Sequence, residues 1–246
     1  MIKLMVHLVK IVIAACIALL FNSCKLEKAF GESVTGSGNV VSKERNVSNF
    51  TKIEVSRGLD CEVTQSDKTQ VTVVADDNVE EGITTVVENG TLKISSKYSN
   101  YNNVASKTVK VNLPKVDVLE TTSGSYLVTK NTIKSTDIHL KSSSGSTLDA
   151  NVESDKVTLE STSGSTINAE GKALEVSTAS SSGSTINAEK LMSNDVTSQS
   201  TSGSSTTIHP IVSLKAKASS GSSIDYVKAP QKISKEESSG GSVDLN

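Results

Sequence analysis

The sequence predicts an all-β protein, a β-solenoid (β-helix) whose coils are each about 19 residues long. First, Ser-Gly-Ser or a near relative recurs every 18 to 21 residues in the second half of the chain. Second, apolar and polar residues alternate around each glycine, as they do on a half-buried strand. Third, the chain has no Trp and only 3% aromatic residues, which suits a thin, extended core better than a compact globule.

The N-terminus has the features of an export signal. Two lysines precede an uncharged apolar run at 11–21, which is too short to cross a bilayer because a transmembrane helix needs about 20 residues. Cys24 follows a small residue just after that run, as in the lipobox of bacterial lipoproteins. We therefore predict a signal peptide at 1–23, a lipidated Cys24 that anchors the protein to a membrane, and a tether at 24–35. The alternative is an ordinary signal peptide with an incidental cysteine.

Charge and cysteine content narrow the possible partners. The formal net charge is -2, so no strong field attracts nucleic acid or an anionic membrane surface. Cys61 occupies an apolar position of an alternating segment, which predicts a small core residue rather than a nucleophile or a ligand. With Cys24 lipidated, no disulfide framework remains, so packing and backbone hydrogen bonds must hold the fold.

Residues 36–116 contain alternating segments without an evident repeat. Runs of alternating Val, Ile and Thr predict strands here, and Asn89-Gly90 between two such runs predicts a tight hairpin turn. We expect this half to form the first, less regular coils of the same column. The whole of 36–246 is then one β-helical head domain.

Residues 117–246 contain seven Ser-Gly-Ser repeats. Their glycines are Gly124, Gly145, Gly164, Gly183, Gly203, Gly221 and Gly240. Apolar residues before and after each glycine, such as Leu159 and Ile167, are expected to point into the core. The serines three and one residues before it, such as Ser161 and Ser163, are also expected to point inward, where their hydroxyls would need hydrogen bonds along the stack. Each glycine should mark a bend that requires a positive φ or a close backbone approach.

Several segments resemble the family described as the putative auto-transporter adhesin head GIN domain, found among Bacteroidetes lipoproteins. The segments are Gly-Ser-Gly-Asn-Val at 36–40, Phe-Thr-Lys-Ile-Glu-Val at 50–55, Asn-Gly-Thr-Leu-Lys-Ile at 89–94, Val-Lys-Val-Asn-Leu-Pro at 109–114, and the Ser-Gly-Ser coils. This resemblance covers nearly all of the mature chain. It implies a β-helical fold and an adhesive or cell-envelope role, and it brings no catalytic residues with it.

The sequence lacks a pattern of residues that predicts catalysis, a metal or a cofactor. His139 and His209 are too far apart in the chain to form a ligand motif, and no serine lies in Gly-x-Ser-x-Gly. The acidic residues at 76–77 and 80–81 fit a solvated loop better than a weak Ca²⁺ site. No aromatic platform for stacking a sugar is evident.

One outward feature is a candidate binding face. Two and four residues after the glycine, successive coils place a hydroxyl and then an amide or carboxylate. These pairs are Thr147 and Asp149, Thr166 and Asn168, Thr185 and Asn187, and Ser223 and Asp225. Stacked, they would form two polar rows able to bind glycan hydroxyls, ordered water or a protein edge. The alternative is that Thr and Asn merely tolerate a solvated strand and bond to one another between coils.

These observations together predict a non-catalytic, lipid-anchored protein of the cell envelope, and of the outer membrane in particular. It would act as an adhesin that offers its polar face to a glycan or a surface protein, with no nucleic acid and no cofactor involved. A structural spacer or scaffold is the second reading. A polysaccharide-processing enzyme is the third, and it would need clustered carboxylates in a groove, whereas those of this sequence are scattered.

Overall fold

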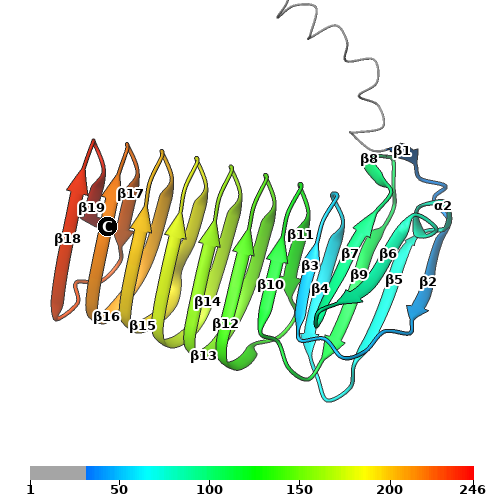
Figure 1. Cartoon of the computed structure of the whole chain (residues 1–246), viewed down its shortest axis with the longest axis horizontal. Helices are drawn as coiled ribbons and strands as arrows, with labels where there is room; N and C mark the ends of the chain where they lie inside the picture. The colour runs from blue at the N-terminus through cyan, green and yellow to red at the C-terminus, as the bar shows by residue number, and fades with distance from the viewer. Residues whose placement is uncertain (1–31) are drawn as a thin grey trace, which may run out of the picture.

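A computed structural model describes residues 32–246, so the predicted signal peptide, Cys24 and most of the predicted tether lie outside the described residues. The described chain forms a long column of stacked β-coils, with a small group of antiparallel strands against one end (Figure 1). The coils repeat with a spacing of ~19 residues, which confirms the predicted β-solenoid. Within 32–246, no helix is both long and apolar enough to cross a bilayer.

The regular part of the column begins at residue 118. Its strands are β10 (Val118–Thr121), β11 (Tyr126–Thr129), β12 (Ile133–Ser142), β13 (Thr147–Ser161), β14 (Thr166–Ser180), β15 (Thr185–Ser200), β16 (Ser205–Ser219), β17 (Ser223–Tyr226), β18 (Lys232–Ser238) and β19 (Ser242–Leu245). Each of these strands up to β17 pairs in parallel with a strand one coil further on. Leu148 pairs with Ile167, and Ile167 pairs with Ile186, so residues at one offset from the glycine stack as the repeat predicts.

The N-terminal half contributes both coils and a cover. Its elements are β1 (Glu32–Thr35), β2 (Val40–Arg45), β3 (Lys52–Val55), β4 (Asp60–Gln65), β5 (Gln70–Asp76), α2 (Asp77–Glu80), β6 (Ile83–Glu88), β7 (Thr91–Ser96), β8 (Tyr98–Asn102) and β9 (Lys107–Leu113). β3 and β4 pair in parallel with β10 and β11 on one side and with β7 and β9 on the other. The first coil in space is therefore β7 and β9, although β3 and β4 precede them in the chain.

Antiparallel strands cover that first coil. β5 pairs with β9 and β2, while β6 pairs with β7. The turn at Asn89-Gly90 joins β6 to β7, which confirms the predicted hairpin. β1 lies inside the segment predicted as a tether, and it pairs in parallel with β8.

The Ser-Gly turns join the two sides of each coil. Ser163 and Gly164 have φ values of 56° and 68°, and two consecutive left-handed residues define a type I′ turn. A Cβ added to Gly164 would meet no heavy atom within 4 Å, so its positive φ, rather than a close approach, calls for glycine. The same turn occurs at Arg57-Gly58, with φ values of 61° and 69°, an additional copy that lacks the Ser-Gly-Ser signature.

The serines around each glycine point inward in a different order from the one predicted. Ser161 is buried as expected, but Ser163 is exposed and Ser165 is buried in its place, because the two left-handed residues interrupt the alternation. The Ser165 hydroxyl accepts a hydrogen bond from the Thr162 N–H (3.2 Å) and donates one to the Ser142 carbonyl of the preceding coil (2.7 Å). Buried hydroxyls in these turns thus bond along the stack, as expected, except that of Ser125, which has no partner within 32–246.

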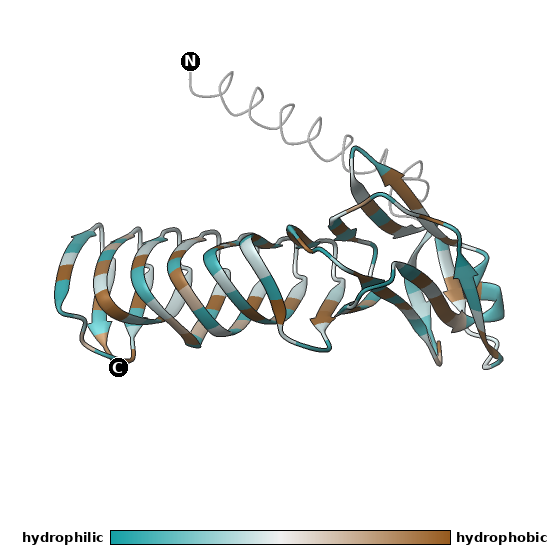
Figure 2. Ribbon diagram, turned by 90° about the horizontal axis from the view of Figure 1, so that it is seen from below, coloured by the Kyte–Doolittle hydropathy of each residue, from teal (hydrophilic) through white to brown (hydrophobic). Residues whose placement is uncertain are grey.

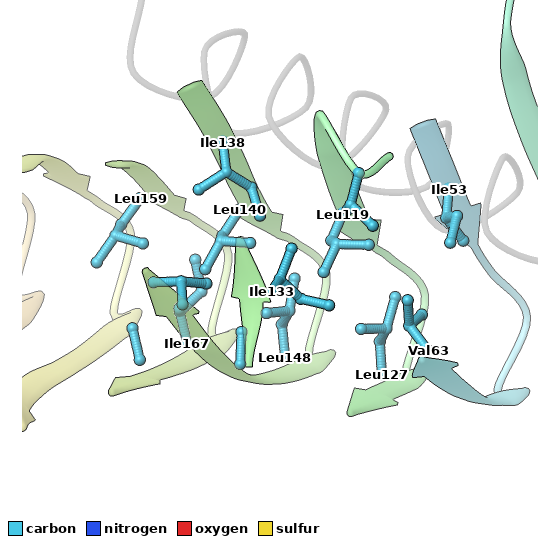
Figure 3. Close-up of a cluster of buried hydrophobic side chains, with 14 of the residues drawn as sticks. Ile53, Val63, Leu119, Leu127, Ile133, Ile138, Leu140, Leu148, Leu159 and Ile167 are labelled. Atoms are coloured by element: carbon cyan, nitrogen blue, oxygen red, sulfur yellow. The ribbon is translucent and has the colours of Figure 1, made fainter. Parts of the chain in front are cut away.

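Aliphatic side chains fill the column between the two sides of each coil. Ile138, Leu140, Leu159 and Ile167 are fully buried and point toward one another in the interior (Figure 3). Apolar and polar segments alternate along every coil (Figure 2). Fully burying one such side chain contributes about 1.5–3 kcal/mol. Cys61 belongs to this core, and burial, with a smaller effect of the neighbouring carboxylates, raises the pKa of its thiol, so it is an inert packing residue as predicted.

Candidate binding face

The two predicted polar rows form on the outer surface of the coils. One row stacks Thr147, Thr166 and Thr185 in register, and the other stacks Asp149, Asn168 and Asn187. β16 continues the rows with Ser205 and Thr207, and β17 with Ser223 and Asp225. All eight predicted side chains are half-buried or exposed, so their outward orientation is as the alternation indicated.

Hydrogen bonds run along the second row. Asn168 Nδ2 donates to Asp149 Oδ1 (2.6 Å), and Asn187 Nδ2 donates to Asn168 Oδ1 (2.8 Å). In both bonds the donor belongs to the later coil and the acceptor to the coil before it. We call these three side chains the amide ladder. Each Asn amide has two N–H groups and uses one in the ladder, so the second can donate to a bound molecule.

A shallow hollow lies beside the amide ladder. Its volume is about 500 Å³, within the range of small-molecule sites. A third row forms its other side, in which Asn151, Glu170 and Lys190 pair in register. The β14–β15 register shifts between Asn168 and Glu170. The hollow therefore presents amide and carboxylate oxygens, amide N–H groups and one ammonium group, which together can both donate and accept hydrogen bonds.

Tyr126 is a member of the face that sequence analysis missed. It precedes Thr147 in the first row, its side chain is 36% exposed, and its hydroxyl donates to Asp149 Oδ2 (2.6 Å). Burial, and then the hydrogen bond to Asp149, raise the pKa of Tyr126 to about 12, so the phenol stays neutral and remains a donor. It lies two residues after Gly124, the same offset as Thr147, so alignment on the glycines could have found this aromatic ring.

Asp76 belongs to a structural network and not to a solvated loop. It is fully buried, and its carboxylate accepts hydrogen bonds from the backbone N–H groups of Gly38 (2.9 Å), Ala105 (3.0 Å) and Ser106 (2.9 Å). The prediction of a solvated acidic loop is therefore wrong at this residue. Its carboxylate fixes the 37–39 segment against 105–106 because it bonds to both.

Glu80 is also buried, and it is paired with two cations. Lys43 Nζ and an Arg45 guanidinium nitrogen both contact its carboxylate. Burial by itself would raise the pKa of Glu80, but the hydrogen bonds and charges of Lys43 and Arg45 lower it below the ordinary value.

Within 32–246, no group of three His, Cys, Asp or Glu side chains is placed to hold a metal ion. The His139 side chain faces outward, and its Nε2 lies 3.5 Å from Asp137 Oδ1.

Comparison with known proteins identifies the fold and its relatives. A family model described as "Putative auto-transporter adhesin, head GIN domain" matches residues 49–230. A putative adhesin from Bacteroides fragilis NCTC 9343 has 20% identity and a TM-score of 0.80, and the match covers 87% of this chain and 100% of that one. No curated protein matches the sequence.

Two further solved structures have the same fold. A putative adhesin from Parabacteroides distasonis ATCC 8503 has 21% identity and a TM-score of 0.71, over 87% of this chain and 100% of that one. A protein described as a putative lipid binding protein, from the same strain, has 19% identity and a TM-score of 0.69, with the same coverage of both chains. At such identities the likeness extends to the fold alone.

Proposed function

Because the chain belongs to the family of putative auto-transporter adhesin head GIN domains, we propose that it is a non-catalytic, lipid-anchored adhesin of the outer membrane. In this proposal Cys24 carries the lipid, 24–35 links it to the column, and the polar face on β13 to β17 binds a glycan. The β-helical column would hold that face away from the membrane.

The observation that carries the proposal is the amide ladder beside the hollow. A sugar hydroxyl both donates and accepts hydrogen bonds, and amides and carboxylates supply both kinds of partner. Asp149 and Asn168 are already held by the ladder, so their binding geometry costs little conformational entropy when a ligand arrives. The exposed ring of Tyr126, at one end of the first row and bonded to Asp149, adds an apolar surface against which the apolar side of a sugar ring can pack.

The second candidate function is a structural spacer, and the same hydrogen bonds support it. Asn168 and Asn187 bond to other side chains of the row, which stabilises the stack whether or not a ligand binds. The two functions differ in what they require of the hollow. A spacer needs only the ladder, whereas an adhesin also needs the hollow to remain open to a ligand.

The binding function is tested by placing four lysines on the face. We expect the combined change of Thr166, Asn168, Thr185 and Asn187 to Lys to abolish adhesion of cells displaying the protein and binding to any glycan-array ligand of the natural chain. Lysines at positions 168 and 187 would fill the hollow and break the ladder, and those at 166 and 185 would cover the adjacent row. The fold should survive, because these positions are solvent-facing and such changes usually cost within about 0.5 kcal/mol each. Circular dichroism checks this.

A matched control lies on the other side of the same two coils. Ser177, Ala179, Thr197 and Gln199 also face outward from β14 and β15, and their change to Lys adds the same charge. This control should bind as the natural protein does. Unchanged adhesion of the Thr166, Asn168, Thr185 and Asn187 variant, with its fold intact, would favour the spacer. Equal loss in both variants would mean that net charge, and not the face, is responsible.

The lipid anchor is tested separately. Cys24→Ala should move the protein from the membrane fraction to the soluble fraction in detergent partitioning, because the thioether cannot form without the thiol. Cys16→Ala removes a cysteine from the predicted signal peptide and should leave the partitioning unchanged. If the Cys24→Ala protein still partitions with membranes, the lipoprotein part of the proposal is wrong.

A further inference from the structure

The last coil breaks the inward pattern of the repeat. Five and three residues before the turn glycine, the other regular coils carry apolar or small residues, such as Ala216 and Ala218 before Gly221. In the last coil these two positions are Lys235 and Glu237, and they pair in register with the two alanines. Two charged side chains therefore lie at the open end of the hydrophobic core.

Both side chains reach across the core to the same residue of β19. Lys235 Nζ donates to the Val243 carbonyl (2.5 Å), and the Val243 N–H donates to Glu237 Oε1 (2.8 Å). The Lys235 ammonium also lies 4.9 Å from the centroid of the Tyr226 ring, a cation–π contact. Val243 itself is fully buried, so the two side chains cover it from the end of the column.

The Val243 backbone groups are those that an additional strand would bond. In a parallel sheet, alternate residues direct their backbone groups to alternate sides of the strand. Ser242 N donates to the Ser222 carbonyl just before β17, and Asn246 N donates to the Tyr226 carbonyl at the end of β17. The backbone groups of Val243 therefore face the opposite way, toward the open edge. Lys235 and Glu237 satisfy the donor and the acceptor that this edge would otherwise offer to another chain.

We propose that Lys235 and Glu237 form an end cap that prevents a second copy of this chain from pairing with the last coil. A second copy fits this end because its own β18 and β19 have the same lengths and spacing, so two last coils can meet strand against strand. The other end of the column differs, since β5 and β6 lie antiparallel across the first coil. This inference is independent of the proposed glycan binding.

The test is to give the last coil the residues of an internal one. The full chain carrying Lys235→Leu and Glu237→Ser, the residue types found at Leu159 and Ser161, should sediment with the mass of two or more chains. The natural protein should sediment as a monomer. A third change, Leu245→Pro, should restore the monomer. Leu245 N–H faces the open edge, so its loss hinders a new strand while leaving the β17 pairing in place.

The matched control removes the same charges from the outer surface. Lys217 and Glu236 form an exposed ion pair 2.7 Å apart on β16 and β18, and Lys217→Leu with Glu236→Ser should leave the protein monomeric. If the end-cap variant loses its β-sheet circular dichroism, Lys235→Met with Glu237→Met, which keeps side-chain length but removes both hydrogen-bonding groups, replaces it. A folded variant that stays monomeric, or one whose association Leu245→Pro does not reverse, overturns the proposal.

Discussion

Gly171→Ala is expected to lower the free energy of unfolding by about 3–5 kcal/mol in a denaturant titration. Gly171 lies within β14 with a φ of 119°, a conformation that L side chains rarely adopt. A Cβ there would lie 2.0 Å from the Val152 carbonyl oxygen of the preceding coil. That oxygen is backbone and belongs to the β13–β14 ladder, so it cannot move aside without breaking the stack.

Gly164→Ala serves as the matched control for this prediction. It also changes a glycine of positive φ, at 68°, but its added Cβ would meet nothing within 4 Å. Its cost should be limited to the left-handed conformation, about 1–2 kcal/mol. Equal losses for the two variants would show that the close approach at Val152 contributes nothing.

Asp76→Ala is expected to produce the second large loss of stability. It removes the charged acceptor of three part-buried hydrogen bonds from backbone N–H groups, and a hydrogen bond to a charged group contributes about 1.5–3 kcal/mol. Asp77→Ala is the neighbouring control, because Asp77 bonds to the exposed side chains of Ser37 and Asn39. Chemical denaturation of the full chain at neutral pH should show a clearly smaller loss for Asp77→Ala.

The contribution of Asp76 should also depend on pH. Burial works to raise its pKa, but the backbone hydrogen bonds outweigh that effect and hold the pKa below the ordinary value of 3.8. The carboxylate therefore stabilises the fold above pH 3.8, and this stabilisation is lost as the pH falls through the lower pKa of the folded state. The stability difference between the natural protein and Asp76→Ala should shrink over that acid range. A difference that is constant down to the lowest pH would contradict the assignment.

The candidate face was partly visible in the sequence. The offsets from the glycine placed Thr166 and Asn168 on one outward side, and the structure stacks them in register with Thr185 and Asn187. The hollow could not be predicted, because residues of four strands, β11, β13, β14 and β15, line it together. Local alternation gives the side of a strand on which a residue lies, but not the shape of the surface formed by several strands.

The sequence by itself determined the solenoid, since a repeated period-two pattern can bury its apolar side only by stacking on its neighbours. It also determined the turns, because Gly164 and its equivalents require a positive φ. Only the tertiary structure decided that β7 and β9 lie before β3 and β4 in the column, and that Asp76 and Glu80 are buried. Those outcomes depend on pairing between segments distant in the chain, and local periodicity carries no information about such partners.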